Sequence, residues 1–173
     1  PARVEERIRD VDDNAGGIRK ETVKFPVFFD PVARNGTPMS EALRFVLRVL
    51  EDWIKSHPES YPPVVINLTD GESTDGDPSG PAEAIRSLST SNGNVLLFNC
   101  HISSREGNPI LYPTADVRLP DEFARLLFNM SSELPAGLLD AAVAEGLSVG
   151  PGSRGFVFQA DLVDVIRFLD IGT

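Results

Sequence analysis

The order of apolar and polar positions predicts one long amphipathic helix in the first third of the chain. Apolar residues recur at helical spacing between positions 39 and 54 and form one stripe over about four turns. Thr37 and Pro38 come directly before this stripe, and a threonine followed by a proline is typical of the N-cap and first position of a helix. The stripe consists of Met39, Leu43, Val46, Leu47, Leu50 and Ile54.

Three further apolar stretches predict strands of a sheet. Residues 63–69 and 95–102 are nearly continuously apolar, which is typical of strands that are buried on both faces. Residues 155–159 (GFVFQ) predict another strand. A short strand is expected near residues 110–112. Helices are expected between and after the strands, at residues 81–88, 121–130, 136–145 and 161–169.

The N-terminal region predicts less regular structure. Residues 1–22 are highly charged, and we expect a polar segment or a short helix that leads to a Gly-Gly turn. Residues 22–29 (TVKFPVFF) are rich in β-branched and aromatic side chains and predict a strand. Pro26 places this strand at the edge of a sheet, because proline has no amide proton for a central ladder.

Strands and helices alternate from residue 63 onward, so we expect an α/β domain with a mainly parallel sheet. Ligands in such sheets bind at the carboxyl ends of the strands. Asp70 lies at one such end, and Thr37 lies in a loop that opens a helix, which can be at the same edge. These two residues are therefore candidates for one site.

Composition and charge narrow the possible partners. The chain has 173 residues, which suits a single domain over 1–173, and a formal net charge of −10. This charge argues against nucleic acid and anionic membranes and favours cations or basic protein surfaces. Cys100 is the single cysteine, which excludes an internal disulfide framework and indicates a cytoplasmic protein. No apolar run approaches the roughly 20 residues of a membrane span.

The stretch VINLTDGESTDGDP, residues 65–78, carries the candidate chemistry. Asp70 follows the predicted strand, and Glu72, Asp75 and Asp77 follow within the same loop. A plain turn would explain Asp70, since Asp-Gly commonly follows a strand, and capping alone would explain Thr37. Asp75 and Asp77 are expected to form a solvated loop. A calcium EF-hand is rejected, because Arg86 occupies the position of the bidentate glutamate.

Three segments together resemble the von Willebrand factor A (vWA) domain family: GTPMSEAL, VVINLTDGEST and GFVFQADLVDVIRFLDIG. The resemblance implies a Rossmann-like sheet, mainly parallel, with helices on both faces and an antiparallel edge strand. It also implies a metal-ion-dependent adhesion site (MIDAS), in which Thr37 matches the threonine of the second loop and Asp70 the aspartate after the fourth strand. The intracellular bacterial members of the family act as assembly or regulatory modules.

One element of the family pattern is missing. The chain contains no DxSxS motif, and no apolar strand precedes residue 22 to carry one. We expect the natural protein to have an upstream segment that supplies this strand, so that the chain is an N-terminally incomplete vWA-like domain. The alternative is a degenerate member of the family.

The resemblance implies a binding module and not an enzyme. Mg²⁺, or Mn²⁺ or Ca²⁺ in its place, would be held by Thr37 and Asp70, and a partner's acidic residue would complete the coordination. The alternative is a scaffold without metal, whose acidic loop meets a basic partner. Metal-dependent phosphoester hydrolysis is a third and weaker interpretation, because Glu72 stands where such a phosphatase has its second aspartate.

Overall fold

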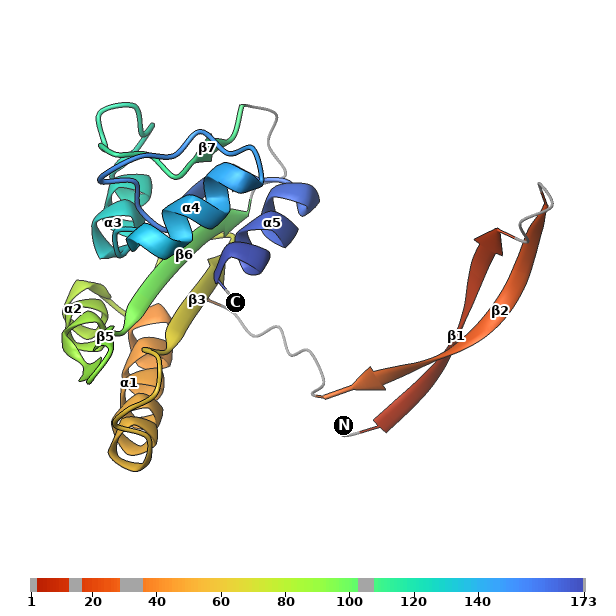
Figure 1. Ribbon diagram of the computed structural model, residues 1–173, viewed down its shortest axis with the longest axis horizontal. Coiled ribbons are helices and arrows are strands. Elements are labelled where there is room, and N and C mark those ends of the chain that lie inside the picture. Colours follow the sequence, from red (N-terminus) through yellow and green to blue (C-terminus); the bar gives the residue numbers. More distant parts are fainter. Residues whose placement is uncertain (1–2, 13–16, 29–35, 103–107, 173) are drawn as a thin grey trace. The chain divides into compact units, whose positions relative to one another are not determined.

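The computed structural model describes residues 3–12, 17–28, 36–102 and 108–172 (Figure 1). The chain divides into two compact units, Pro1–Asn35 and Gly36–Thr173. Each unit is described by itself below. The expectation of a single domain over residues 1–173 stays a prediction.

The first unit is a β-hairpin. Strand β1 (Arg3–Asp12) pairs antiparallel with β2 (Ile18–Val27), in a register that runs from Arg3 opposite Val27 to Asp12 opposite Ile18. The described residues of the 1–22 segment are thus polar, as expected, but they form strands and not a short helix; Gly16 of the expected Gly-Gly turn is outside the described residues. The charged residues of this segment face opposite charges on the other strand, and such cross-strand pairs stabilise a ladder: Glu6 with Lys24, Arg9 with Glu21, and Asp10 with Lys20.

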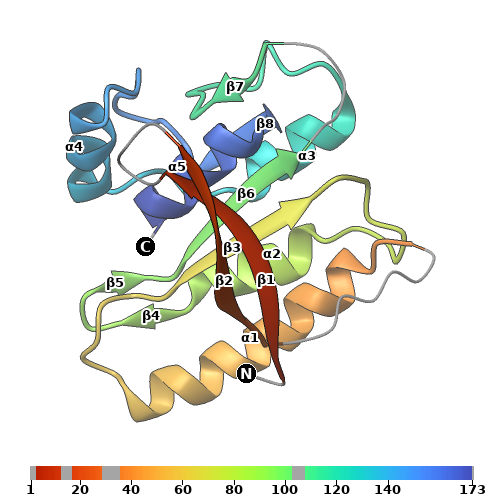
Figure 2. The same ribbon diagram turned by 90° about the vertical axis from the view of Figure 1, so that its right-hand side faces the viewer.

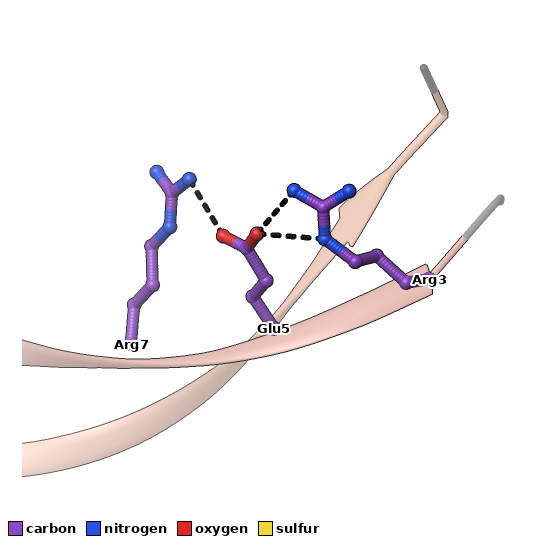
Figure 3. A network of polar contacts seen from close by, with 3 residues as sticks. All are labelled: Arg3, Glu5 and Arg7. Atoms are coloured by element: carbon purple, nitrogen blue, oxygen red, sulfur yellow. Dashed lines mark hydrogen bonds and ion pairs between the residues drawn. The ribbon is translucent and has the colours of Figure 1, made fainter. Parts of the chain in front are cut away.

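An exposed polar network lies along β1 (Figure 3). The Glu5 carboxylate accepts hydrogen bonds from Arg3, at 2.8 Å from Nη2, and from Arg7, at 3.1 Å. These hydrogen bonds, first that from Arg3, lower the pKa of Glu5 below its ordinary value. Arg7 also lies over the ring of Phe25 on β2, 4.1 Å from its centroid. The strand predicted over 22–29 is confirmed as β2, which starts earlier, at Ile18, and ends at Val27; Phe28 lies beyond the strand, and Phe29 is outside the described residues.

The second unit is built on a four-stranded sheet in the order β3-β6-β8-β7 (Figure 1). Strands β3 (Val64–Thr69), β6 (Leu96–Ile102) and β8 (Phe156–Ala160) are parallel, and the short β7 (Ile110–Leu111) is antiparallel at one edge. The expected mainly parallel α/β sheet is thus confirmed. A small two-stranded ladder, β4 (Ser89–Thr90) with β5 (Gly93–Asn94), is separate from it.

Helices cover both faces of this sheet, as the two views show (Figures 1 and 2). Helices α1 (Met39–Ser56), α2 (Ser79–Ser87) and α3 (Glu122–Met130) contribute to one apolar core, while α4 (Ala136–Ala144) and α5 (Leu162–Gly172) contribute to the other. Successive side chains of a strand point to opposite faces. On β6, Leu97 accordingly packs in the first core and Phe98 in the second.

The apolar stripe predicted for residues 39–54 is confirmed as the buried face of α1. Met39, Leu43 and Leu50 are buried, and the remaining three members of the stripe pack against the same core. The stripe therefore fixes how α1 lies against its neighbours, since its burial stabilises this orientation.

Strand β3 differs from expectation. It was predicted to be buried on both faces, but it lies at the end of the strand order among the described residues, and most of its side chains are only partly buried. Leu68 is 44% exposed, whereas Leu97 on the neighbouring strand is fully buried. Apolar composition indicated a central strand, but the neighbours of a strand decide how much of it is covered.

Candidate functional site

The candidate site begins at the turn that follows β3. Thr69 ends this strand, and its hydroxyl donates to the carbonyl of Gly71 at 2.8 Å and accepts from the amide of Gly71 at 3.3 Å. This local ring closes a tight turn around Asp70. The carboxylate of Asp70 is therefore held in an exposed position at the carboxyl end of a parallel strand, where α/β sheets bind ligands.

Thr37 lies beside this turn. A methyl group added to Gly71 would lie 3.6 Å from the Thr37 hydroxyl oxygen. The loop before α1 and the acidic loop are joined by two hydrogen bonds: the Thr37 amide donates to the Thr74 hydroxyl at 2.8 Å, and the Thr74 amide donates to the Thr37 carbonyl at 2.9 Å. The structure thus brings together the two residues that the sequence proposed for one site.

Gly36 makes this junction possible. Its φ of +99° favours glycine, and a methyl group there would lie 2.7 Å from the Thr74 hydroxyl. A larger residue would strain the backbone and press against the Thr74 side chain, which accepts from the Thr37 amide. The glycine before Thr37 therefore helps to keep the Thr37 loop against the acidic loop.

Asp75, and not Thr37, caps helix α1. Pro38 occupies the N-cap position without a side-chain hydrogen bond. The Asp75 carboxylate accepts instead from the amides of Ser40 at 3.0 Å and Glu41 at 2.7 Å. The capping interpretation of Thr37 is therefore wrong. Asp75 is exposed, as expected for a solvated loop, but it also caps the helix. Sequence spacing could not show this cap, because Asp75 lies 34 and 35 residues from the amides it binds.

The capping contacts also set the ionisation of Asp75. Partial desolvation opposes ionisation of the exposed Asp75 carboxyl, but hydrogen bonds from Ser40, Glu41 and Ser73 outweigh this effect and lower the pKa of Asp75 below its ordinary value. Asp77 behaves as an ordinary turn residue: its carboxylate accepts from the Ser79 amide at 2.9 Å, which lowers its pKa. The solvated-turn interpretation fits Asp77.

A cavity of about 450 Å³ opens at the carboxyl ends of β3, β6 and β8. Asp70 and Glu72 line it from the acidic loop, and Asp121 lines it from the start of α3. One oxygen of Asp121 accepts from the amide of Ala124 at 2.7 Å and so caps that helix. Glu72 and Asp121 were not predicted for the site, and for Asp121 the sequence offered only the signal of a helix start.

Aromatic rings form another wall of this cavity. The ring of His101 stacks on Phe158, with centroids 4.4 Å apart, and meets the edge of the Phe123 ring at 5.8 Å. His101 therefore packs as part of this wall, in agreement with the structural role expected for it. The cavity thus combines carboxylates at its rim with a flat aromatic surface.

The side chains of Thr37 and Asp70 are the right kind of ligand for a hard divalent cation, but two ligands are too few to hold it alone. A hydroxyl and a carboxylate are oxygen ligands of the kind that Mg²⁺ prefers, and neither side chain makes a hydrogen bond within the described residues. Mg²⁺ takes about six ligands. In the described part of the chain, no three His, Cys, Asp or Glu side chains are grouped to hold a metal ion, so most ligands would have to come from elsewhere.

Comparison of the chain with protein-family models, with curated proteins and with solved structures finds no match. Within the residues that the structure describes, no helix combines the length and apolar character that crossing a bilayer requires. The functional argument therefore depends on the geometry of the site.

Proposed function

We propose that this protein is a vWA-type interaction module that binds a protein partner through a divalent cation at a MIDAS-like site, without a catalytic step. The observation that carries this proposal is the position of the Thr37 hydroxyl beside the Asp70–Gly71 turn, at the carboxyl end of β3. Capping does not occupy Thr37, because Asp75 performs that task. Its hydroxyl is therefore left for another ligand.

Each residue has a distinct role in the proposal. Thr37 would hold the cation through its hydroxyl oxygen, and Asp70 through a carboxylate oxygen, directly or through water. Asp75 would position Thr37, because it anchors the start of α1 to the acidic loop. The remaining ligands would be water, an acidic side chain of the partner, and the oxygens of a DxSxS segment where the natural protein carries one. A bound Mg²⁺ would supply the charge that attracts the partner's carboxylate.

Mn²⁺ titration followed by NMR tests the proposal. Paramagnetic Mn²⁺ should broaden the amide signals of Thr37, Asp70 and Gly71 first, and excess Mg²⁺ should restore them. Asp70→Asn and Thr37→Val should each reduce this selective broadening at least several-fold. Asp77→Asn is the matched control, because it removes a charge from the same loop and keeps the oxygen that accepts from Ser79.

Two results would contradict cation binding at this site. The first is broadening that spreads equally over all exposed carboxylates. The second is broadening that Asp70→Asn leaves unchanged, which would show that the cation binds elsewhere.

A second candidate function is a metal-free scaffold that binds a basic partner. The three carboxylates around the cavity, Asp70, Glu72 and Asp121, favour it. In that case partner binding would survive EDTA and weaken as salt screens the charges. For the cation-dependent module, EDTA should abolish partner binding, and added salt should weaken it much less.

A further inference from the structure

The cavity beside Asp70 has the features of a binding pocket for one particular side chain. It has a volume of about 450 Å³ and lies where three parallel strands end. Its walls come from segments that are far apart in the sequence, namely the loop after β3, the end of β6, the start of α3 and the end of β8. The fold therefore assembles this cavity, and a local turn does not account for it.

The charge of the described cavity lining is one-sided. Asp70, Glu72 and Asp121 contribute three carboxylates, and its described lining contains no Lys or Arg. None of the three forms an ion pair within the described residues. Asp121 uses one oxygen to cap α3, which leaves the other without a hydrogen bond in that part of the chain. A cationic group in the cavity would be attracted by all three carboxylates.

The aromatic wall selects among cations. His101 and Phe158 are stacked at an interplanar angle of 13°, and Phe123 meets His101 at 74°. A planar guanidinium stacks on such rings and is more weakly hydrated than an ammonium group. It can also bind two carboxylate oxygens at once. These features favour arginine over lysine.

We propose that this cavity binds the guanidinium of an arginine side chain of the protein partner. Glu72 and Asp121 accept its hydrogen bonds, the partly exposed rings of Phe123 and His101 contact it, and Asp70 remains with the cation. The proposal rests on the proposed function insofar as the arginine belongs to a protein partner. It implies that the partner offers an acidic residue and an arginine close together.

The test uses Nα-acetyl-arginine methylamide as the probe, followed by NMR of the isotope-labelled chain in EDTA. We expect saturable shifts at the cavity residues, with a Kd on the order of 1 mM for one side chain. The citrulline derivative has the same shape without the charge, and it should bind at least tenfold more weakly. The lysine derivative should bind several-fold more weakly than the arginine derivative.

Charge-removing variants locate the site. Glu72→Gln and Asp121→Asn should each raise the Kd for the arginine probe about five- to tenfold. Asparagine is as good an N-cap as aspartate, so the second variant keeps α3 capped. Asp140→Asn on α4 is the control, since Asp140 is exposed and does not line the cavity. Its Kd should be unchanged.

The outcomes separate this proposal from the cation-binding proposal. Equal binding of the citrulline derivative, unchanged Kd in both cavity variants, or shifts that map to the other exposed carboxylates would each overturn the arginine pocket. None of these results bears on Mn²⁺ binding, because the titration contains EDTA. Conversely, a failed Mn²⁺ titration overturns the cation site and leaves the arginine result standing.

Discussion

The carboxylate of Asp75 accepts a hydrogen bond of 2.7 Å from the backbone amide of Glu41, in the first turn of α1. A side chain of the acidic loop thereby performs the capping that the sequence assigned to Thr37. The contact couples two functions, since it satisfies the helix terminus and holds the Thr37 loop beside Asp70. Stability and cation binding should therefore respond together when Asp75 is changed.

We expect Asp75→Ala to lower the midpoint of thermal unfolding and to weaken Mn²⁺ binding at Thr37 and Asp70, because the start of α1 loses its anchor. Thermal unfolding by circular dichroism and the Mn²⁺ titration measure the two effects. Asp77→Ala, in the same loop, should change both less. An unfolding midpoint equal to that of the unaltered protein would show that water replaces the cap at no cost.

The pKa of Asp75 also predicts an acid dependence. A carboxyl group whose pKa is lower in the folded state stabilises that state above its unfolded pKa, and this stabilisation is lost as the pH falls through the folded value. The unfolding midpoint of the unaltered protein should therefore fall below about pH 4 more steeply than that of Asp75→Asn. If the unfolding midpoints of the two proteins fall equally steeply with pH, this prediction is wrong.

Gly155 should tolerate no side chain. A methyl group there would overlap the ring of Phe98, which is fully buried. We expect Gly155→Ala to reduce the free energy of unfolding by about 2–3 kcal/mol, measured by urea denaturation. Gly137→Ala is the control, because nothing lies near a methyl group at that helical position. This control should be neutral or stabilising by up to about 1 kcal/mol.

The same clash predicts a rescue. If the overlap with the Phe98 ring causes the loss, then Phe98→Leu should cost less in the Gly155→Ala background than in the unaltered protein. If the losses of unfolding free energy in the two single variants simply add in the double variant, then contact with the Phe98 ring is not the cause of the Gly155→Ala effect.

Tyr112 carries a buried hydroxyl whose removal should stabilise the protein. Its side chain is 3% exposed, and its hydroxyl has no hydrogen-bond partner in the described structure. Desolvation of such a group is unfavourable, so Tyr112→Phe should raise the free energy of unfolding by about 1 kcal/mol while the stacking on Phe168 is kept. A lower value in urea denaturation would indicate that the hydroxyl has a partner, such as a water molecule.

Cys100 should be unreactive in the folded protein. Burial, assisted by the charge of Asp164, raises the pKa of its thiol from the ordinary 9.0 to about 11. Alkylation by iodoacetamide at pH 8 should therefore proceed only as fast as the protein opens, and urea should accelerate it strongly. Fast alkylation without urea would contradict the burial of this residue.

The same shift predicts an alkaline loss of stability. A group whose pKa is raised on folding contributes full stability below its unfolded pKa and loses it as the pH rises through the folded value. For Cys100 this window runs from about pH 9 to about pH 11, and the loss is on the order of 3 kcal/mol. Cys100→Ala should remove this part of the decline, while the contribution of Tyr112, whose pKa burial also raises, should remain.

Most helices and main-sheet strands of the second unit could be predicted from local apolar patterns, although the β4–β5 ladder was not predicted. The ranges predicted for α1, β6 and β8 agree with the structure to within a few residues at either end. Asp121 was expected at the start of a helix, and it caps α3. The α1 stripe was found because periodicity records which face of a helix is covered, and β6 because a continuous apolar run records burial on both faces.

Three features could not be predicted in this way. The charges of residues 3–12 suggested a polar segment, but partners on β2 make them a strand. The apolar run of β3 suggested full burial, but the strand has one neighbour in the described sheet. The cavity beside Asp70 needs Asp121 and Phe158, which no spacing rule connects to the acidic loop.

By itself the sequence determined the mainly parallel α/β sheet, the helical stripe of α1, and the position of Asp70 at a strand end, because these follow from the apolar pattern and the order of elements along the chain. The tertiary structure alone decided that Asp75 caps α1, that the Thr37 hydroxyl is thereby left beside Gly71, and that carboxylates and aromatic rings share one cavity. Each of these features depends on backbone groups or side chains that come from distant segments of the chain. No periodic pattern in the sequence shows which of these distant residues will be in contact.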